Sequence, residues 1–246
     1  MPATPAWPPQ STPRLFIDTE LAPGSIGIDG PPAHYLIAVM RLKIGDPVKL
    51  FDDRTGEWLA VAASLGKRDL ILDVTDRLRA REPVPDLWLC AAPLKKGRVD
   101  WMAEKACELG VARLVPVITR RAMVDKPKAD RLRAHMIEAA EQCGRTALPA
   151  LAETVKLPAL LNDWPETRTL FFADETGGAP AMEAMRTHPG PAAILIGPEG
   201  GFDDAERAAI RALPQAIGIT LGPRILRADT AAAAAVSVWM AAAGDW

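Results

Sequence analysis

Two glycine-containing segments near the C-terminus carry the residue types from which a ligand site can be built. The first is Gly197-Pro198-Glu199-Gly200-Gly201, which follows the apolar run AAILI and precedes a D-x-x-E helix-capping pattern at Asp203. The second is LGPRILRADT, residues 221–230, which follows AIGIT. In parallel sheets ligands gather where strands end and loops lead into helices, so both segments are candidate binding loops.

The chemistry of these loops argues against the commonest ligands of such turns. Neither loop reads GxxxxGK[ST] or GxGxxG, and Glu199 would repel a phosphate. The loops suit a neutral or cationic ligand with an adenine-like ring that backbone groups can hydrogen-bond. S-adenosylmethionine, which has a sulfonium and no phosphate, fits this description. The alternative is that Gly197–Gly201 is only a tight turn that needs positive φ.

The elements that must position these loops alternate between strands and helices. From Leu87 onward, apolar runs predict strands at 87–92, 113–118, 169–174, 192–197 and 216–222. Each is followed by a helical pattern, at 98–110, 129–144, 179–188, 202–213 and 229–243. This alternation is typical of an α/β fold with a parallel sheet covered on both faces. Because one unit separates the two loops, adjacent strands are expected to place them side by side.

The first 80 residues predict a small β-barrel or compact sheet with one helix. Short apolar segments alternate with turns, RTG at 54–56 is a plausible hairpin turn, and PPAHYLIAVMR at 31–41 predicts a helix that starts with proline. The prolines of AREPVPD then break the pattern. We therefore expect a β domain over 1–80, with 1–13 disordered, a linker at 81–86 and an α/β domain over 87–246.

Composition and charge indicate which kinds of partner the protein binds. There is no apolar run of about 18 residues, no signal-peptide pattern, no CxxC motif and no histidine cluster, which predicts a cytoplasmic protein without a membrane span, disulfide or metal. The net charge is only −2, but residues 95–133 contain 11 Lys or Arg against 5 Asp or Glu. Fixed cations gathered on one rim attract phosphates whatever the total charge, although solvated helix faces are an equal alternative.

The motifs in their order resemble one known family. IGPEGGFDDAE followed by LGPRILRADTAAAAAVSVW is similar to the SPOUT methyltransferases, and specifically to the ribosomal RNA small subunit methyltransferase E family. AHYLIAVMRLKIGD, LKKGRVDWMAEKACELGVARLVPVITRRAMV and EAAEQCGR resemble further signatures of that family. In one respect the chain departs from it. The last signature usually reads Arg-Thr-Glu-Thr and here reads Arg227-Ala228-Asp229-Thr230, which leaves the roles of Ala228 and Asp229 open.

The resemblance implies an N-terminal PUA-like RNA-binding domain, a C-terminal domain with a trefoil knot, and a homodimer that methylates N3 of a uridine in 16S rRNA of the small ribosomal subunit. It implies that S-adenosylmethionine contacts Asp174, Glu175, Leu195, Gly197, Pro198, Glu199, Gly200, Gly201, Leu221, Gly222, Ile225, Leu226 and Arg227. It also implies RNA contacts from Arg14, Arg41, Lys43, Lys95, Lys96, Arg98, Arg120, Arg121 and Arg145.

The target atom determines what catalysis requires. Uridine N3–H is a weakly acidic imide, so the site must orient the base and help to remove a proton. In one route a carboxylate accepts the proton, with Glu199 and Asp229 as the main candidates and Asp174 and Glu175 as weaker ones. In the alternative route the guanidinium of Arg227, or of Arg224, stabilises the developing uracil oxyanion and makes N3 more acidic without a strong base. The sequence does not choose between these routes. Asp229 is also expected to cap its helix. Two other hypotheses stay open: methylation of a different RNA position, and a non-catalytic ribosome-assembly factor.

Overall fold

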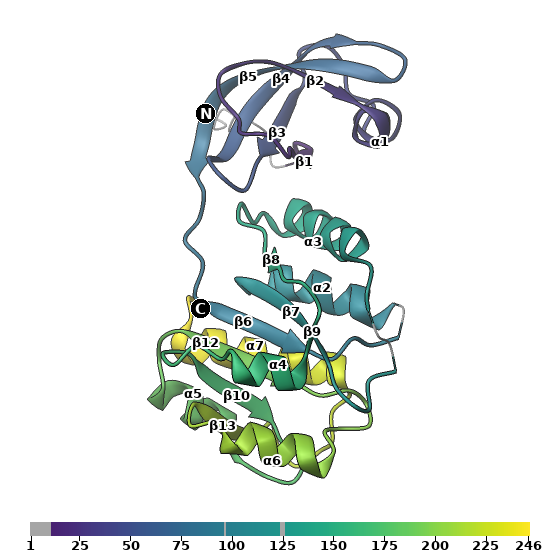
Figure 1. Cartoon of the computed structure of the whole chain (residues 1–246). Helices are drawn as coiled ribbons and strands as arrows, with labels where there is room; N and C mark the ends of the chain where they lie inside the picture. Colours follow the sequence, from purple (N-terminus) through teal and green to yellow (C-terminus); the bar gives the residue numbers. More distant parts are fainter. Residues whose placement is uncertain (1–10, 96, 124–125) are drawn as a thin grey trace. The chain divides into compact units, whose positions relative to one another are not determined.

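The computed structural model describes residues 11–95, 97–123 and 126–246, which form two compact units (Figure 1). The first unit spans the chain up to Pro83 and includes Glu141–Ala147. The second consists of Val84–Ala140 and Leu148–Trp246. The segment 141–147 therefore belongs to the first unit, although the sequence pattern placed it within the second domain.

The first unit is built on a five-stranded sheet with the order β1-β3-β4-β5-β2. β1 runs parallel to β3, and the other neighbouring strands are antiparallel. Alternate residues of β5, among them Leu70, Leu72 and Val74, are buried on one face, as the period-2 pattern requires. The strands are β1 (Arg14–Phe16), β2 (Gly24–Asp29), β3 (Pro47–Phe51), β4 (Gly56–Leu65) and β5 (Asp69–Ala80).

The predicted hairpin turn at 54–56 is confirmed, because it joins the antiparallel strands β3 and β4. The buried carboxylate of Asp52 organises the turn by accepting hydrogen bonds from the backbone N–H groups of Arg54 and Thr55. Gly56 has φ +116°, and a Cβ there would lie 2.3 Å from the carbonyl oxygen of Arg79. Only glycine fits at this position.

The predicted helix at 31–41 is only partly correct. The structure has a short α-helix, α1 (Gly30–His34), followed by a π-helical segment, η1 (Tyr35–Val39). Ala33 and Leu36 are both fully buried, so packing against the sheet determines how the chain winds here. Arg41 follows with φ +55°, a left-handed conformation that ends the helical segment.

The second unit contains a parallel sheet with the order β11-β13-β10-β12-β6-β7-β8, and β9 also pairs with β7. The five predicted strand-to-helix units are confirmed. They comprise β6 (Leu87–Ala91), α2 (Arg98–Glu108), β7 (Arg113–Ile118), α3 (Ala129–Cys143), β10 (Thr169–Ala173), α5 (Ala181–Thr187), β12 (Ala192–Ile196), α6 (Asp204–Ala212), β13 (Ala216–Thr220) and α7 (Ala228–Ala243).

Four short elements were missed by the sequence analysis. They are β8 (Ala150–Leu151), β9 (Val155–Lys156), α4 (Leu157–Asn162) and β11 (Ala179–Pro180). The three strands have two residues each, which is too short for any period in hydrophobicity to show. Their positions are decided by pairing with β7 and β13, which are distant in sequence.

Helices cover both faces of this sheet (Figure 1). α2 and α5 pack against α7, which contacts β12 and β6, while α4 packs against α6 and contacts β7. All five residues of β12 are buried, because a central parallel strand has no face open to water. The predicted helix end at Gly110 is confirmed, since this residue directly follows α2 and its C-cap and has φ +89°.

The described residues also limit other chemistry. No described helix has both the length and the hydropathy to cross a bilayer. Within the same residues, no three His, Cys, Asp or Glu side chains gather in a way that could hold a metal ion. Cys90 is fully buried, and burial raises the pKa of its thiol to about 12.

Candidate active site

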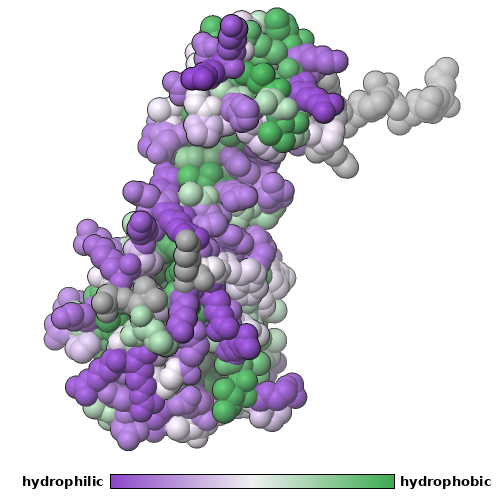
Figure 2. Space-filling view, turned by 90° about the vertical axis from the view of Figure 1, so that its right-hand side faces the viewer, coloured by the Kyte–Doolittle hydropathy of each residue, from purple (hydrophilic) through white to green (hydrophobic). Residues whose placement is uncertain are grey.

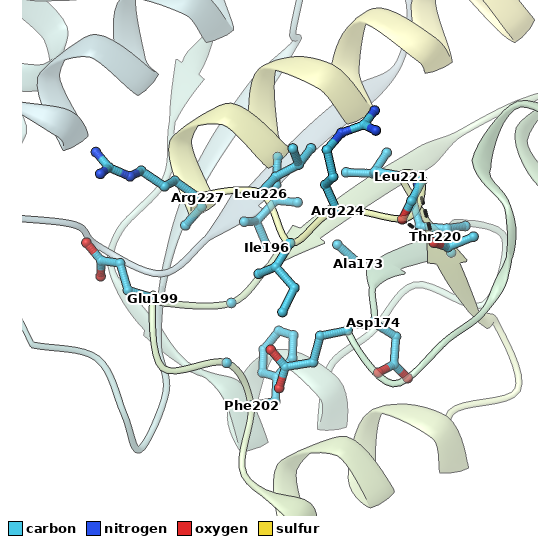
Figure 3. A pocket seen from close by; sticks show the side chains of 18 of the residues that line it. Ala173, Asp174, Ile196, Glu199, Phe202, Thr220, Leu221, Arg224, Leu226 and Arg227 are labelled. Atoms are coloured by element: carbon cyan, nitrogen blue, oxygen red, sulfur yellow. Dashed lines mark hydrogen bonds between the residues drawn. The ribbon is translucent and has the colours of Figure 1, made fainter.

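Three neighbouring strands of the second unit end at one edge of the sheet. β13, β10 and β12 are adjacent and parallel, so the loops that follow them, 221–227, 174–178 and 197–203, meet there. The loops enclose a cavity of about 350 Å³ (Figure 3). The expectation that β12 and β13 are neighbours is wrong, because β10 lies between them. The two glycine loops nevertheless line the same cavity, on either side of the loop after β10.

Most of the predicted cofactor contacts line this cavity. All of them do so except Leu195 and Gly200: Asp174, Glu175, Gly197, Pro198, Glu199, Gly201, Leu221, Gly222, Ile225, Leu226 and Arg227. The assignment of Leu195 to an apolar slot is wrong, because its side chain is fully buried in the core. Successive side chains of a strand point to opposite faces, and it is the next residue, Ile196, that lines the cavity.

The loop after β12 has a fixed backbone. Gly201 N–H donates to the carbonyl oxygen of Pro198 at 2.9 Å, and Gly201 has φ +66°. The predicted capping box is confirmed, with Asp203 Oδ1 accepting from Glu206 N–H at 2.7 Å and Glu206 Oε2 accepting from Asp203 N–H at 3.1 Å. Gly197 lies close to Phe202, because a Cβ at Gly197 would be 3.2 Å from the Phe202 ring, a tight contact.

The loop after β10 begins with a buried carboxylate. Asp174 accepts hydrogen bonds from Thr176, and its Oδ2 lies 2.6 Å from a guanidinium nitrogen of Arg211. Burial alone would raise the pKa of Asp174, but the hydrogen bonds from Thr176 and Arg211 hold it below its usual value. Asp174 is therefore ionised and already paired, so it stabilises the loop rather than accepting a proton.

Arg207 of α6 connects the loop after β12, where it donates to the carbonyl oxygen of Phe202 at 3.4 Å, with the loop after β10. Its guanidinium lies 3.3 Å from Asp174 Oδ1 and 2.9 Å from Glu175 Oε1, and its side chain is only 12% exposed. Glu175 is thereby held against Gly201, where a Cβ would lie 2.5 Å from Glu175 Oε1. The backbone of the loop after β12 and the carboxylate of Glu175 in the loop after β10 thus form one wall of the cavity.

The loop after β13 is different, because its long side chains are exposed. Arg224, Ile225 and Arg227 all line the cavity, and Ile225 is 90% exposed. Across the described residues, the side chains of Arg224 and Arg227 make no hydrogen bond or ion pair, and Figure 3 shows them extending in different directions from the loop. Two unpaired guanidinium groups beside a cavity can bind a phosphate or an oxyanion.

Asp229 does not cap its helix as expected. α7 begins at Ala228, so Asp229 lies inside the first turn and the N-cap residue is Arg227, which makes no side-chain cap. There the carboxylate faces the positive end of the helix dipole and contacts Arg98. Arg98 lies 3.2 Å from Glu199 Oε1 and 3.8 Å from Asp229 Oδ2, so one arginine joins the two candidate proton acceptors.

The candidate RNA contacts of the first unit fall into two groups. Arg41 and Lys43 are exposed. Arg14 is mostly buried, stacks over the ring of Phe51 at 4.1 Å and pairs with Glu57, while Arg145 is 6% exposed. The structure thus gives Arg14 and Arg145 packing roles, which the charge pattern did not reveal.

The candidate RNA contacts of the second unit are also divided. Lys95 is exposed, and Lys96 lies outside the described residues. Arg120 pairs with Asp203, and Arg121 donates to the carbonyl oxygen of Gly200, so both contact the loop after β12. Part of the excess positive charge over 95–133 is therefore paired with groups of the protein itself.

Several residues of the site were not found from the sequence. Ile196, Phe202 and Ile219 supply apolar walls, and Arg207 connects the loops. Phe202 had a signal, since it is the one aromatic residue between the glycine loop and the capping box. Arg207 had none, because its partners Asp174 and Glu175 lie more than thirty positions earlier in the chain.

Comparison with known families agrees with this arrangement. Residues 80–240 match the model of the RNA methyltransferase domain, and residues 28–75 match that of the RNA methyltransferase PUA domain. The fold and the site therefore define an enzyme, an RNA methyltransferase with an N-terminal PUA domain. The PUA match includes α1, β3, β4 and the first part of β5 of the first unit, and the methyltransferase match includes all three loops.

Individual relatives refine the assignment. The chain is 30% identical to ribosomal RNA small subunit methyltransferase E of Bacillus subtilis, covering 91% of this chain and 94% of the relative, and 28% identical to that of Rickettsia conorii, covering 91% and 93%. The solved structure of the same protein from Neisseria gonorrhoeae, with bound S-adenosyl methionine, has a TM-score of 0.85 at 25% identity, covering 96% and 99% of the two chains. A Legionella pneumophila structure described as a methyltransferase with bound SAM has a TM-score of 0.84 at 29% identity, also covering 96% and 99%. The chain belongs to the ribosomal RNA small subunit methyltransferase E family.

Proposed function

We propose that the protein transfers the methyl group of S-adenosylmethionine to N3 of a specific uridine in the 16S rRNA of the small ribosomal subunit. The observation that carries the proposal is the cavity formed by the loops after β10, β12 and β13, with unpaired Arg224 and Arg227 at its side. The names of the relatives and the cofactor bound in two similar structures support it.

The residues of the cavity fit this cofactor. Ile196, Ile219, Leu221 and Leu226 offer apolar surface for an adenine ring. Glu175 and Glu199 offer carboxylates for the cofactor's hydroxyl groups and its positive charge. The left-handed glycine of the loop after β12 brings backbone close to the cavity without a side chain, as backbone recognition of a nucleoside requires.

The chain's own residues orient the base and handle its proton. Bound S-adenosylmethionine supplies an electrophilic methyl carbon. The Arg227 guanidinium stabilises negative charge on a uracil carbonyl oxygen, which makes N3–H more acidic. Glu199 or Asp229 accepts the proton, and Arg98 contacts both carboxylates, at 3.2 Å from Glu199 Oε1 and 3.8 Å from Asp229 Oδ2.

The substrate and assembly follow from surfaces outside the cavity. The exposed side chains of Arg41, Lys43 and Lys95 are proposed to contact RNA phosphates. A homodimer formed through the methyltransferase domain is supported by α7, whose partly exposed face carries Ala233, Ala234 and Ser237 and allows close approach of a second helix. The trefoil knot and a cytoplasmic location remain part of the proposal.

The test uses purified protein, S-adenosylmethionine and small ribosomal subunits from cells that lack the gene. After incubation the 16S rRNA is digested and its nucleosides are examined by mass spectrometry for 3-methyluridine. We expect the nucleoside to appear with the wild-type protein and with Arg186→Ala, an exposed arginine of α5 outside the site, and to be lost with Arg227→Ala. A different methylated nucleoside would contradict the proposed substrate. If the protein binds the small ribosomal subunits but no methylated nucleoside appears, the result would favour the assembly-factor hypothesis.

A further inference from the structure

The segment after β7, Thr119–Arg121, lies against the outside of the loop after β12. Arg121 donates from one guanidinium nitrogen to the carbonyl oxygen of Gly200 at 2.7 Å and to that of Phe202 at 3.5 Å. The aliphatic carbons of Arg121 also cover Gly200, at 3.4–4.0 Å from the position of a Cβ. Arg121 therefore both packs on the loop and hydrogen-bonds its backbone.

Arg120 fixes the far end of the same loop. Its backbone N–H donates to Glu206 Oε1 at 2.7 Å, and its guanidinium lies 3.3 Å from Asp203 Oδ2. Glu206 is only 7% exposed and belongs to the capping box that starts α6. The loop is thus held at Gly200 by one arginine and at Asp203 and Glu206 by the other.

Arg121 acts from behind the cavity. Gly197, Pro198, Glu199 and Gly201 line the cavity, whereas neither Gly200 nor Arg121 does. Gly200 immediately precedes Gly201, whose left-handed conformation turns the chain. A donor on the Gly200 carbonyl therefore restrains the peptide that joins these two glycines, without touching a ligand in the cavity.

We propose that Arg121 is a positioning residue that preorders the loop after β12 for S-adenosylmethionine, rather than an RNA contact. The inference rests on the proposed use of this cofactor. A loop already held in its binding conformation loses less entropy when the ligand binds, so the contribution of Arg121 is realised as cofactor affinity. The catalytic groups do not depend on it once the cofactor is bound.

The experiment compares Arg121→Met, Arg121→Lys and Arg186→Ala in the full chain. Methionine keeps the aliphatic packing and removes the donor, while lysine restores a donor that can reach a carbonyl. Cofactor affinity is measured by calorimetry with S-adenosylmethionine, and rates are measured on small ribosomal subunits. Affinity of the cofactor-free protein for those subunits is measured at two salt concentrations.

We expect Arg121→Met to weaken S-adenosylmethionine binding about tenfold, the size of one hydrogen bond to a charged group. The KM for the cofactor should rise by a similar factor, with kcat at saturating cofactor unchanged. Arg121→Lys should recover most of the affinity, and Arg186→Ala should match the wild type. Melting temperatures without cofactor should agree within about 2 °C, because Arg121 is exposed.

Two results would overturn the assignment. One is unchanged cofactor affinity in Arg121→Met, and the other is a loss of ribosomal-subunit affinity with a smaller salt dependence, which would make Arg121 a phosphate contact. If the wild type binds the cofactor but methylates no rRNA, the proposed substrate is wrong, while the binding comparison still decides the role of Arg121.

Discussion

The loops on the two sides of the cavity are built in opposite ways. The loop at 197–203 is fixed by a capping box, by Arg120 and Arg121 behind it and by Arg98 on Glu199. The loop at 221–227 exposes Arg224, Ile225 and Arg227, and within the described chain the side chains of the two arginines have no partner. The wall at 197–203 is therefore formed before a ligand binds. The wall at 221–227 has side chains that are free to contact a ligand.

Under the proposed function, this difference explains how one cavity would accept both the cofactor and a nucleotide of the RNA. A preformed wall binds the smaller ligand, the proposed cofactor, at low entropic cost. Unpaired guanidinium groups keep their charge available for a phosphate or a developing oxyanion of the second ligand. Replacements in the fixed loops should therefore change stability or cofactor affinity, and replacements in the exposed loop should act only when a ligand is bound.

The largest effect is expected at Asp174, the buried anchor of the loop after β10. Asp174→Asn removes the charge facing Arg207 and Arg211 and should lower the free energy of unfolding by about 2–3 kcal/mol. Asp204→Asn is the matched control, because that fully exposed carboxylate also pairs with Arg207 and its replacement should leave the free energy of unfolding nearly unchanged. Denaturant unfolding of both variants measures this difference. Equal losses would show that Asp174 is not an anchor.

The same contact predicts a pH dependence. The pKa of Asp174 is lower in the folded protein than its ordinary value of 3.8, so its stabilisation is fully present above that value and is lost as the pH falls through the folded pKa. The difference in unfolding free energy between wild type and Asp174→Asn should stay constant from pH 7 to about pH 5, and then shrink below the ordinary pKa. A difference that grows on acidification would contradict this sign.

An intermediate effect is expected in the glycine loop. Gly201→Ala forces a left-handed residue and places a Cβ against Glu175, so cofactor affinity should fall about tenfold, or roughly 1–2 kcal/mol. Gly200→Ala is the matched neighbour, because its φ is not in the left-handed region and its Cβ would make an ordinary contact with Arg121. Calorimetry with S-adenosylmethionine measures both. Equal affinities in the two variants would show that this wall is not preformed.

The smallest effect is expected at Ile225 in the exposed loop. Ile225→Ala should leave the cofactor-free stability within about 0.5 kcal/mol, since an exposed side chain buries nothing on folding. It should weaken cofactor binding by about 1 kcal/mol, because the side chain is expected to be buried only by the ligand. Melting curves with and without S-adenosylmethionine separate the effect on stability from the effect on cofactor binding. Destabilisation without the cofactor would make this loop as fixed as its opposite.

The fold was largely predictable because its signals are local. Apolar runs of five or six residues, amphipathic helices, Gly110 after α2 and the capping box at Asp203 each depend on neighbours in the sequence. The order of the strands was not predictable, and the expectation that β12 and β13 are adjacent failed for this reason. The π-helix at Tyr35–Val39 also comes from packing against a sheet formed by distant residues.

The sequence by itself determined the α/β alternation, the two glycine loops and the absence of a phosphate-binding motif, because backbone conformation and residue chemistry are local properties. Only the tertiary structure decided which charges are available. It enclosed most of the Arg14 side chain, buried Arg145, placed Arg98 between Glu199 and Asp229 and set Arg121 behind the glycine loop. It also left the Arg227 side chain unpaired within the part of the chain that it describes. The type of a charged residue does not reveal whether its side chain will be paired. Its partners come from strands and helices that meet only in the folded chain.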